Sequence, residues 1–464
     1  MFQKVLVANR GEIAVRIIRT LRELGIASVA IYSEADVESL HVQLADEAVC
    51  VGDAAAQASY LNRQNILSAA ILTGADAIHP GFGFLAENAG FAEMCAACQI
   101  TFIGPQPATI ELMGNKANAR EFMRQANIPV IPGSDGFIAD VAAAKAVAAK
   151  IGYPFLLKAA AGGGGKGIRK VTCAADVAPQ FMAAQQEAEL SFGDQRMYIE
   201  KVMTAAKHIE VQVFRDQQGH VVTFPERDCS AQRHHQKVLE ESPCVLLTPS
   251  KREQLLALAR KATTAMAYLN TGTLEFLMDQ QQNFYFMEMN TRIQVEHPVT
   301  EMVTGIDLIR EQILVASGAA LSFRQQDIQI RGHAIECRLN AEDPLQNFLP
   351  AAGTIDYLYW PLGGLGIRID SGVYAGSTVP PFYDSMIAKL ITFAPERTQA
   401  IVKMSRLLQE LVIHGITTNQ QFSAALLTDS SYLAGTLTTN EISQHFLPQW
   451  LAQQKLGDEQ HAAV

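Results

Sequence analysis

The stretch GTLEFLMDQQQNFYFMEMNTRIQVEHP, residues 272–298, contains two apolar, strand-like runs separated by the short turn QQQN. A hairpin that pairs Asp279 with Phe284 places Glu275 directly opposite Glu288. Two facing carboxylates among Phe and Leu neighbours repel each other, and a divalent cation between them removes the conflict. Hard oxygen ligands favour magnesium or manganese, especially where phosphate supplies further ligands. The alternative is an exposed sheet face that tolerates both charges.

Polar side chains continue to alternate with apolar ones after Glu288, at Asn290, Arg292, Gln294 and Glu296. If the chain stays extended, all of them project to one side, because strand side chains have a period of two. An Arg–Gln pair suits a small planar oxyanion, and a nearby Glu can act as a general base. A solvated edge strand would show the same alternation, so the pattern alone leaves both interpretations open.

A second informative stretch is KAAAGGGGKGIRK, residues 158–170. A Walker-type loop is excluded, because Ala160 and Gly167 stand where it needs a glycine and a Ser or Thr. The dinucleotide pattern is met almost automatically by a run of glycines, but the strand-like IRKVT follows instead of a helix. The stretch therefore predicts a strand–loop–strand hairpin whose tip can lie along a polyphosphate. An ordinary glycine-rich turn remains the alternative.

The remaining pattern divides the chain into three parts. Residues 1–115 alternate strand and helix, with KVLVAN, EIAVRIIRTLREL, ASVAIYS, GADAIHPG and ITFIGP, which predicts a doubly wound parallel α/β domain. Residues 116–330 contain an Ala-rich helix, the glycine hairpin and long strands with antiparallel spacing. Residues 331–447 show short strands and the helical RTQAIVKMSRLLQELVI, an α+β pattern. We expect the polar tail, residues 448–464, to fray.

The composition limits the classes of partner. The chain has 37 basic and 47 acidic residues, a net charge of -10, which argues against nucleic acid or an anionic membrane as a general partner. No apolar run approaches the roughly 18 residues of a membrane span, and the N-terminus lacks the apolar core of a signal peptide. Seven scattered cysteines fit a reducing compartment, so we expect a cytoplasmic protein.

Several strings together resemble one family. ANRGEIAVRIIR, HPGFGFLAEN, LMGNK, KAAAGGGGKG, ERDCSAQRHHQK, EMNTRIQVEHPVTE, RGHAIECRLNAEDP and VPPFYDSM are similar to the biotin carboxylase component of acetyl-CoA carboxylase, an ATP-grasp enzyme, over residues 1–445. The resemblance implies a biotin carboxylase N-terminal domain at 1–115, an ATP-grasp domain at 116–330 and a C-terminal α+β domain at 331–447. It also implies that a mobile glycine-loop lid, about residues 131–203, closes over ATP.

The resemblance assigns roles to individual residues of this chain. It places the nucleotide at Lys116, Lys158, Gly162, Gly163, Gly164, Gly165, Lys166, Gly167, Glu200, Lys201, Met203, His208, Gln232 and His235. It places magnesium or manganese at Glu275 and Glu288, with Asn290. It places bicarbonate at Lys237, Arg292, Gln294 and Val295, the catalytic base at Glu296, and the group near the biotin oxygen at Arg338. The chain departs from the family pattern at Ala161, Lys166 and His234.

The implied reaction begins when Glu296 deprotonates bicarbonate, which attacks the γ-phosphate of ATP to give carboxyphosphate. Carboxyphosphate breaks down to carbon dioxide and phosphate, the phosphate takes the ureido proton of biotin, and Arg338 stabilises the resulting enolate. Two rival interpretations are an ATP-grasp ligase that joins a carboxylate to an amine, and a non-catalytic nucleotide sensor. RIQVEHP together with Lys237 argues against the first, and the complete set of acidic and basic residues argues against the second.

The resemblance also implies partners. Biotin is normally attached within a Met-Lys-Met turn, and no such triplet occurs in the 464 residues. We therefore expect the biotin to arrive on a separate biotin carboxyl carrier protein, with carboxyltransferase subunits completing malonyl-CoA formation for fatty acid biosynthesis. The family resemblance further suggests a homodimer.

Overall fold

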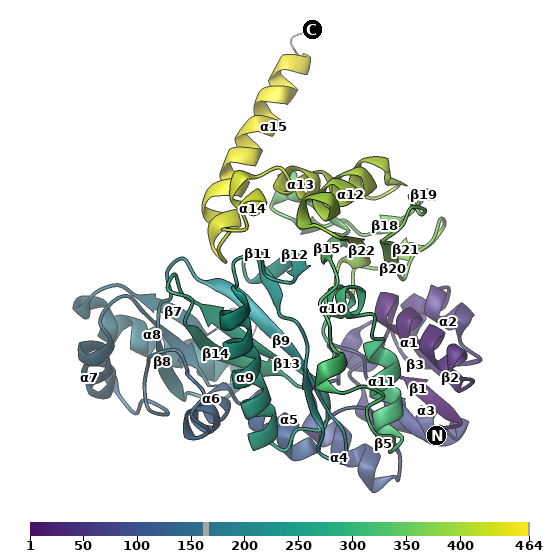
Figure 1. The fold of residues 1–464 in the computed structure, drawn as a ribbon, viewed down its shortest axis with the longest axis horizontal. Helices are drawn as coiled ribbons and strands as arrows, with labels where there is room; N and C mark the ends of the chain where they lie inside the picture. Colours follow the sequence, from purple (N-terminus) through teal and green to yellow (C-terminus); the bar gives the residue numbers. More distant parts are fainter. Residues whose placement is uncertain (161–166, 463–464) are drawn as a thin grey trace.

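The computed structural model describes residues 1–160 and 167–462. The predicted loop residues Gly162, Gly163, Gly164, Gly165 and Lys166 lie outside the described residues. The body combines a parallel sheet, a small sheet on one side, and a large antiparallel sheet through the centre (Figure 1). Within the described residues, no helix is long and apolar enough to cross a membrane.

The N-terminal part is a five-stranded parallel sheet in the order β3-β2-β1-β4-β5. Apolar side chains pack on both of its faces, as the doubly wound prediction requires. The strand at 47–52 was not predicted from the sequence, because it is a half-exposed edge strand without an apolar run. The elements are β1 Lys4–Val7, α1 Gly11–Glu23, β2 Ala27–Ser33, α2 Leu40–Leu44, β3 Glu47–Gly52, α3 Arg63–Thr73, β4 Ala77–His79, α4 Ala89–Ala97 and β5 Thr101–Phe102.

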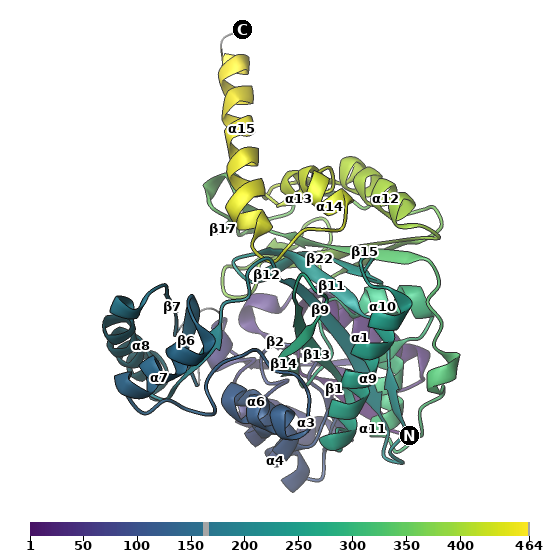
Figure 2. The ribbon, with the colours of Figure 1, turned by 60° about the vertical axis from the view of Figure 1, so that its left-hand side comes forward.

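A small antiparallel sheet, in the order β7-β6-β8, stands apart from the body with two helices on it (Figures 1 and 2). Its first two strands pair on either side of the glycine run, which confirms the predicted strand–loop–strand arrangement. Asp140 accepts a hydrogen bond from the amide of Ala143 and so begins the Ala-rich helix. The elements from 107 to 201 are α5 Pro107–Gly114, α6 Lys116–Gln125, α7 Val141–Ile151, β6 Phe155–Ala159, β7 Ile168–Val171, α8 Val177–Phe192 and β8 Met197–Lys201.

The central sheet runs β14-β13-β9-β11-β12-β15-β22-β20, with β10 paired to β9. The sheet contains strands from both the predicted part 116–330 and the predicted part 331–447, because β12 pairs directly with β15. The polar groups of β15 are therefore held in register with those of β12. The elements are β9 Lys207–Arg215, β10 Val221–Thr223, β11 Arg227–Arg233, β12 Gln236–Ser242, α9 Pro249–Ala265, β13 Asn270–Met278, β14 Phe284–Asn290, α10 His297–Thr304, α11 Leu308–Ala316, β15 His333–Asn340, β20 Ile367–Ser371 and β22 Met386–Ala394.

The hairpin of β13 and β14 carries Glu275 opposite Glu288, as predicted. The route to this register differs from the prediction. Phe284 pairs with Met278, not with Asp279, and the register shifts by one residue between Phe276 and Glu275. A bulge on β14 therefore compensates for the different turn, and the two carboxylates still meet.

The extended conformation predicted for 291–296 is wrong. β14 ends at Asn290, and Glu296 is the residue that precedes the first turn of α10, with φ -81° and ψ 12°. Pro298 favours the helix start, because its ring presets φ and it lacks the amide donor that a first turn leaves unused. The side chains from 290 to 296 therefore converge through a turn instead of along a strand.

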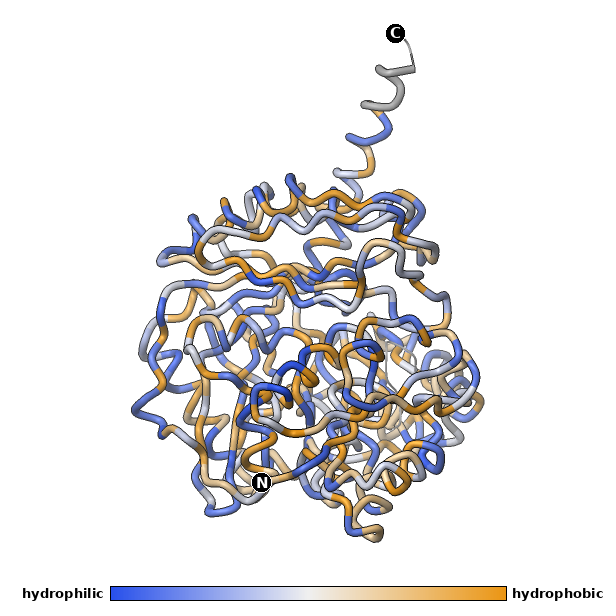
Figure 3. The backbone as a smooth tube through the Cα atoms, turned by 90° about the vertical axis from the view of Figure 1, so that its right-hand side faces the viewer, coloured by the Kyte–Doolittle hydropathy of each residue, from blue (hydrophilic) through white to orange (hydrophobic). Residues whose placement is uncertain are grey.

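The C-terminal tail is also helical, where we expected fraying. Helix α15, Leu447–Ala462, projects from the body (Figure 2), and hydrophilic and hydrophobic residues follow one another in the part of it nearest the body (Figure 3). Its first turn is anchored by Trp450, which is buried edge-on against Phe422 at a centroid distance of 5.3 Å. The other C-terminal elements are β16 Glu342–Asp343, β17 Leu349–Pro350, β18 Gly353–Thr354, β19 Tyr357–Tyr359, β21 Thr378–Val379, α12 Arg397–Glu410, β23 Val412–His414, α13 Gln420–Leu426 and α14 Ser430–Leu433.

Candidate active site

The centre of the site is the Lys237 ammonium group, on β12, which meets three carboxylates. Its Nζ lies 2.6 Å from Glu210 Oε2 and 3.4 Å from Glu275 Oε1, and it also donates a hydrogen bond to Glu296 Oε1. Burial disfavours the positive charge, but the acidic groups around it raise the pKa of Lys237 well above its ordinary value. Lys237 is therefore a fixed cation in the middle of an acidic cluster.

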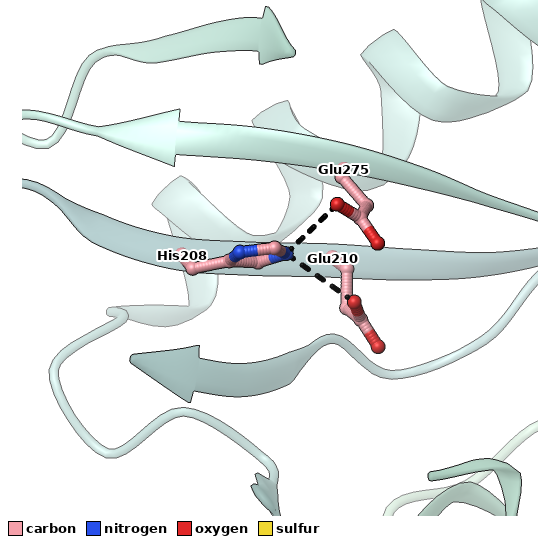
Figure 4. Close-up of side chains that lie close together, drawn as sticks. All are labelled: His208, Glu210 and Glu275. Atoms are coloured by element: carbon pink, nitrogen blue, oxygen red, sulfur yellow. Dashed lines mark ion pairs between the residues drawn. The ribbon is translucent and has the colours of Figure 1, made fainter. Parts of the chain in front are cut away.

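His208 and Glu210, on β9, and Glu275, on the neighbouring β13, lie together at one end of this cluster (Figure 4). His208 Nε2 is 3.2 Å from Glu275 Oε2 and 3.4 Å from Glu210 Oε2. Burial lowers the pKa of His208, but the carboxylates outweigh it and raise the value to about 9. Both distances are within ion-pair range, so the trio is an ion-paired group in this structure.

Glu296 is held between two cations. One carboxylate oxygen accepts from Lys237, and the other, Oε2, lies 2.9 Å from Arg338 Nη2. Arg338 projects from β15 and also donates from Nε to Glu240 Oε1, at 2.5 Å. Glu240 is fully buried on β12, so it restricts the guanidinium. The expected base and the expected biotin-binding arginine are therefore in direct contact.

Three polar side chains, those of Asn290, Arg292 and Gln294, lie next to the same cluster. Asn290 Nδ2 and Gln294 Nε2 each donate to Glu275 Oε1 at 2.7 Å. Arg292 donates from Nη2 to Asn290 Oδ1 at 3.0 Å and from Nε to Glu87 Oε2, in the N-terminal part, at 2.9 Å. The structure therefore brings an arginine, an amide and a lysine to one place, the set expected for a planar oxyanion.

The residues predicted as metal ligands have the oxygen donors that a hard divalent cation prefers. Glu275 and Glu288 offer carboxylate oxygens from adjacent strands, with Asn290 beside them. In the structure cations already balance both charges. Lys116 Nζ lies 2.6 Å from Glu288 Oε2, and Lys237 and His208 approach Glu275. Oxygen donors of this kind, next to lysines, are suited to magnesium bound together with phosphate oxygens.

The residues expected around the nucleotide surround the small sheet and the turn between β11 and β12. Lys158 donates to Glu200 Oε2, Lys201 Nζ donates to the carbonyl of Tyr153 at 2.9 Å, and the side-chain amide of Gln232 lies 2.9 Å from His208 Nδ1. Met203 lies just after β8 and is half-buried. Gly167 has φ +71° at the start of β7.

His235 occupies the turn after β11, with φ +66°. Burial lowers the pKa of His235, and the positive charges of Lys158 and Lys116 lower it further. The turn therefore lies close to both lysines, although one belongs to β6 and the other to α6.

Three family models match consecutive parts of the chain. They are described as "Biotin carboxylase, N-terminal domain", residues 1–110, "Carbamoyl-phosphate synthase L chain, ATP binding domain", residues 115–324, and "Biotin carboxylase C-terminal domain", residues 336–444. Biotin carboxylase 1 of Bacillus subtilis is 54% identical over 440 residues, which cover 95% of this chain and 98% of that protein. The chain belongs to the biotin carboxylase family. It is therefore a biotin carboxylase, an ATP-dependent ligase.

Solved structures agree with this assignment and with the ATP-grasp fold. A Campylobacter jejuni biotin carboxylase, titled as a β,γ-ATP complex, has a TM-score of 0.93 and 47% identity over 96% of this chain and 99% of its own. The biotin carboxylase domain dimer of Hydrogenobacter thermophilus 2-oxoglutarate carboxylase was solved with MgADP, ADP and bicarbonate. It has a TM-score of 0.91 and 47% identity, over 96% and 98% of the two chains.

Another relative is named as a subunit of pyruvate carboxylase. A pyruvate carboxylase subunit from Methanothermobacter thermautotrophicus is 49% identical over 445 residues, 96% of this chain and 90% of that protein. This biotin carboxylase is therefore similar to subunits of several carboxylases.

Sequence reasoning missed four residues of the candidate site. Arg227 is fully buried and donates to Glu210 Oε1 and Gln294 Oε1, each at 2.5 Å. Glu240 holds Arg338, and Glu87 holds Arg292. Glu210 carried a usable signal, because the alternation of HIEVQ places it on the same strand face as His208.

Proposed function

We propose that this biotin carboxylase uses ATP and bicarbonate to carboxylate biotin on a separate biotin carboxyl carrier protein, through carboxyphosphate. The observation that carries the proposal is the position of Glu296, whose carboxylate lies between Lys237 and Arg338. Glu296 therefore lies between the lysine proposed to bind bicarbonate and the arginine proposed to bind the biotin oxygen, so the two halves of the reaction meet at this side chain.

In the first half, Glu296 takes the proton of bicarbonate, and the freed oxygen attacks the γ-phosphorus of ATP as the bond to ADP breaks. Lys237, Arg292 and Gln294 orient the bicarbonate, and the backbone at Val295 completes its contacts. Lys116 and Lys158 stabilise negative charge on the phosphates. When bound at Glu275 and Glu288, magnesium supplies further charge neutralisation at the phosphate oxygens.

In the second half, carboxyphosphate separates into carbon dioxide and phosphate, and the phosphate accepts the N–H proton of the biotin ureido group. The ureido oxygen gains negative charge, which the Arg338 guanidinium stabilises, and the nitrogen then attacks carbon dioxide. Carboxybiotin, ADP and phosphate are the products. The proposed division into a domain at 1–115, an ATP-grasp domain at 116–330 with its lid at about 131–203, and a domain at 331–447 lets the lid exclude water during these steps.

The test is to incubate the purified chain with ATP, bicarbonate and free biotin and to measure the release of phosphate. Biotin and bicarbonate should both be required for full turnover, and carboxybiotin should form. A nucleotide sensor would show no turnover, and a carboxylate–amine ligase would need an amine in place of biotin. Intact mass after expression with a biotin ligase should show no covalent biotin, and a carrier's biotin should be carboxylated faster than free biotin.

We further propose that the chain acts as a homodimer and supplies carboxybiotin to carboxyltransferase subunits of an acetyl-CoA carboxylase. The dimer is supported by the Hydrogenobacter thermophilus structure, which is titled as a dimer. The choice of acetyl-CoA rests on the motifs EMNTRIQVEHPVTE and ERDCSAQRHHQK, which resemble the biotin carboxylase component of acetyl-CoA carboxylase. The chain can be purified together with its bound partners, and the complex can then be assayed for carboxylation of acetyl-CoA, of pyruvate and of 2-oxoglutarate. Carboxylation of pyruvate or 2-oxoglutarate, but not acetyl-CoA, would contradict the proposal.

A further inference from the structure

A buried lysine lies behind the base, outside the residues discussed above. Lys389, on β22, is fully buried and stands directly opposite Arg338 across the β15–β22 pairing. Its Nζ donates to the backbone carbonyl of Val295 at 2.8 Å and lies 3.1 Å from Glu12 Oε1. Glu12 belongs to α1, so the ammonium group contacts two segments that are distant in the chain and joins both of them to β22.

The carbonyl that Lys389 holds belongs to the peptide unit between Val295 and Glu296. That unit is planar, so a fixed carbonyl also fixes the direction of the Glu296 amide and the Cα from which the base projects. The preceding carbonyl, of Gln294, is held by His297 Nδ1 at 2.8 Å, and His297 is fully buried as well. The turn 294–296 is therefore held from behind at two successive peptides.

The same turn has no strand or helix to define it. β14 ends at Asn290 and α10 begins at His297, so the ladder hydrogen bonds of a regular element do not position it. The side chain of Glu296 is held on the other side by Lys237 and Arg338. Two charged contacts therefore act on the carboxylate, and Lys389 acts on the backbone beneath it.

A buried ion pair is weak support for stability, because the desolvation of both charges offsets most of their attraction. Apolar residues of similar size would fill the space between β22 and α1 without the free-energy cost of desolvating two charges. They would, however, offer no hydrogen-bond donor to the Val295 carbonyl. We infer that Lys389 is a positioning residue for the bicarbonate site, which acts through the Val295–Glu296 peptide and is supported by Glu12 of the N-terminal part.

This inference rests on the proposed bicarbonate site. The test is the double variant Lys389→Met with Glu12→Gln, which removes the donor and neutralises the carboxylate that pairs with it. We expect it to fold, to bind ATP with an unchanged Kd, and to show a bicarbonate KM raised by about tenfold or more, because small displacements of reacting groups are costly. Lys389→Gln, whose shorter side chain withdraws the donor from the carbonyl, should change the bicarbonate KM in the same direction.

Lys207 provides a matched control. It is also a buried lysine, it pairs with Asp228 at 2.9 Å, and it donates to two backbone carbonyls, of Gly435 and Leu437. Lys207→Met should lower the Tm without raising the bicarbonate KM. An unchanged bicarbonate KM and kcat in both Lys389 variants, or an equal rise of KM in Lys207→Met, would overturn the inference. Full activity in Glu296→Gln would instead refute the proposed site itself.

Discussion

Arg338 Nη2 lies 2.9 Å from Glu296 Oε2, so the group proposed to take the bicarbonate proton directly contacts the group proposed to stabilise the biotin enolate. Arg338 comes from β15 and is half-buried, whereas Glu296 comes from the turn before α10 and is buried. The contact joins the two halves of the proposed reaction in space. Carbon dioxide formed beside Glu296 would therefore be released next to the biotin that accepts it.

Replacing Glu296 with Gln should abolish proton abstraction while keeping the shape of the side chain. We expect biotin-dependent turnover to fall by about 10²–10⁴-fold, the range for loss of a general base, with ATP binding retained. Phosphate release and nucleotide titration measure the two effects. A variant with full turnover would show that another group accepts the proton.

Arg338→Met should abolish biotin carboxylation and also lower stability, because it leaves the fully buried Glu240 without its partner. Breaking a buried pair on one side costs about 3–5 kcal/mol. Adding Glu240→Gln should recover much of the stability without restoring carboxybiotin formation. Urea unfolding and carboxybiotin assays separate the two roles, and recovery of activity in the double variant would argue against a role for Arg338 in catalysis.

Glu288→Gln should raise the magnesium concentration needed for ATP turnover and lower the maximal rate, because one anionic ligand opposite Glu275 is lost. The fold should remain intact, since Glu288 lies at a partly exposed position beside Lys116. A magnesium titration measures the effect. Glu253→Gln, at an exposed position on α9, is the matched control and should leave the titration unchanged; identical curves for both variants would refute the metal assignment.

Glu241 should make the free energy of unfolding depend on pH in the acidic range. It accepts hydrogen bonds from His333 Nε2 at 2.7 Å and from Arg397 Nε at 2.6 Å, which join β12 to β15 and α12. Burial opposes its charge, but these partners lower the pKa of Glu241 from 4.5 to about 2. The folded state therefore favours the ionised form, so this contribution is complete above pH 4.5 and is lost as the pH falls towards 2.

Glu241→Gln should consequently be less stable at pH 7, by about 3–5 kcal/mol, and should lose less stability than the parent protein between pH 5 and pH 3. Urea unfolding at several pH values measures both. Parallel stability curves for the variant and the parent protein would contradict the assigned role of Glu241.

The sequence by itself determined the features that depend on local periodicity. Alternation predicted the two strands β13 and β14 that carry Glu275 and Glu288, and the strand-like residues on either side of the glycine run predicted the hairpin of β6 and β7. The strand–helix–strand pattern of the first 115 residues predicted the parallel sheet, because each element buries a face whose spacing is visible along the chain.

The tertiary structure alone decided which charged groups meet. The bulge that restores the hairpin register and the turn at 291–296 have no periodic signal, so extrapolation of the strand was wrong there. Arg227, Glu240 and Lys389 acquire their contacts through packing between segments far apart in the chain. Buried charges of this kind are stable only when distant partners surround them, and the identity of those partners is a property of the folded chain.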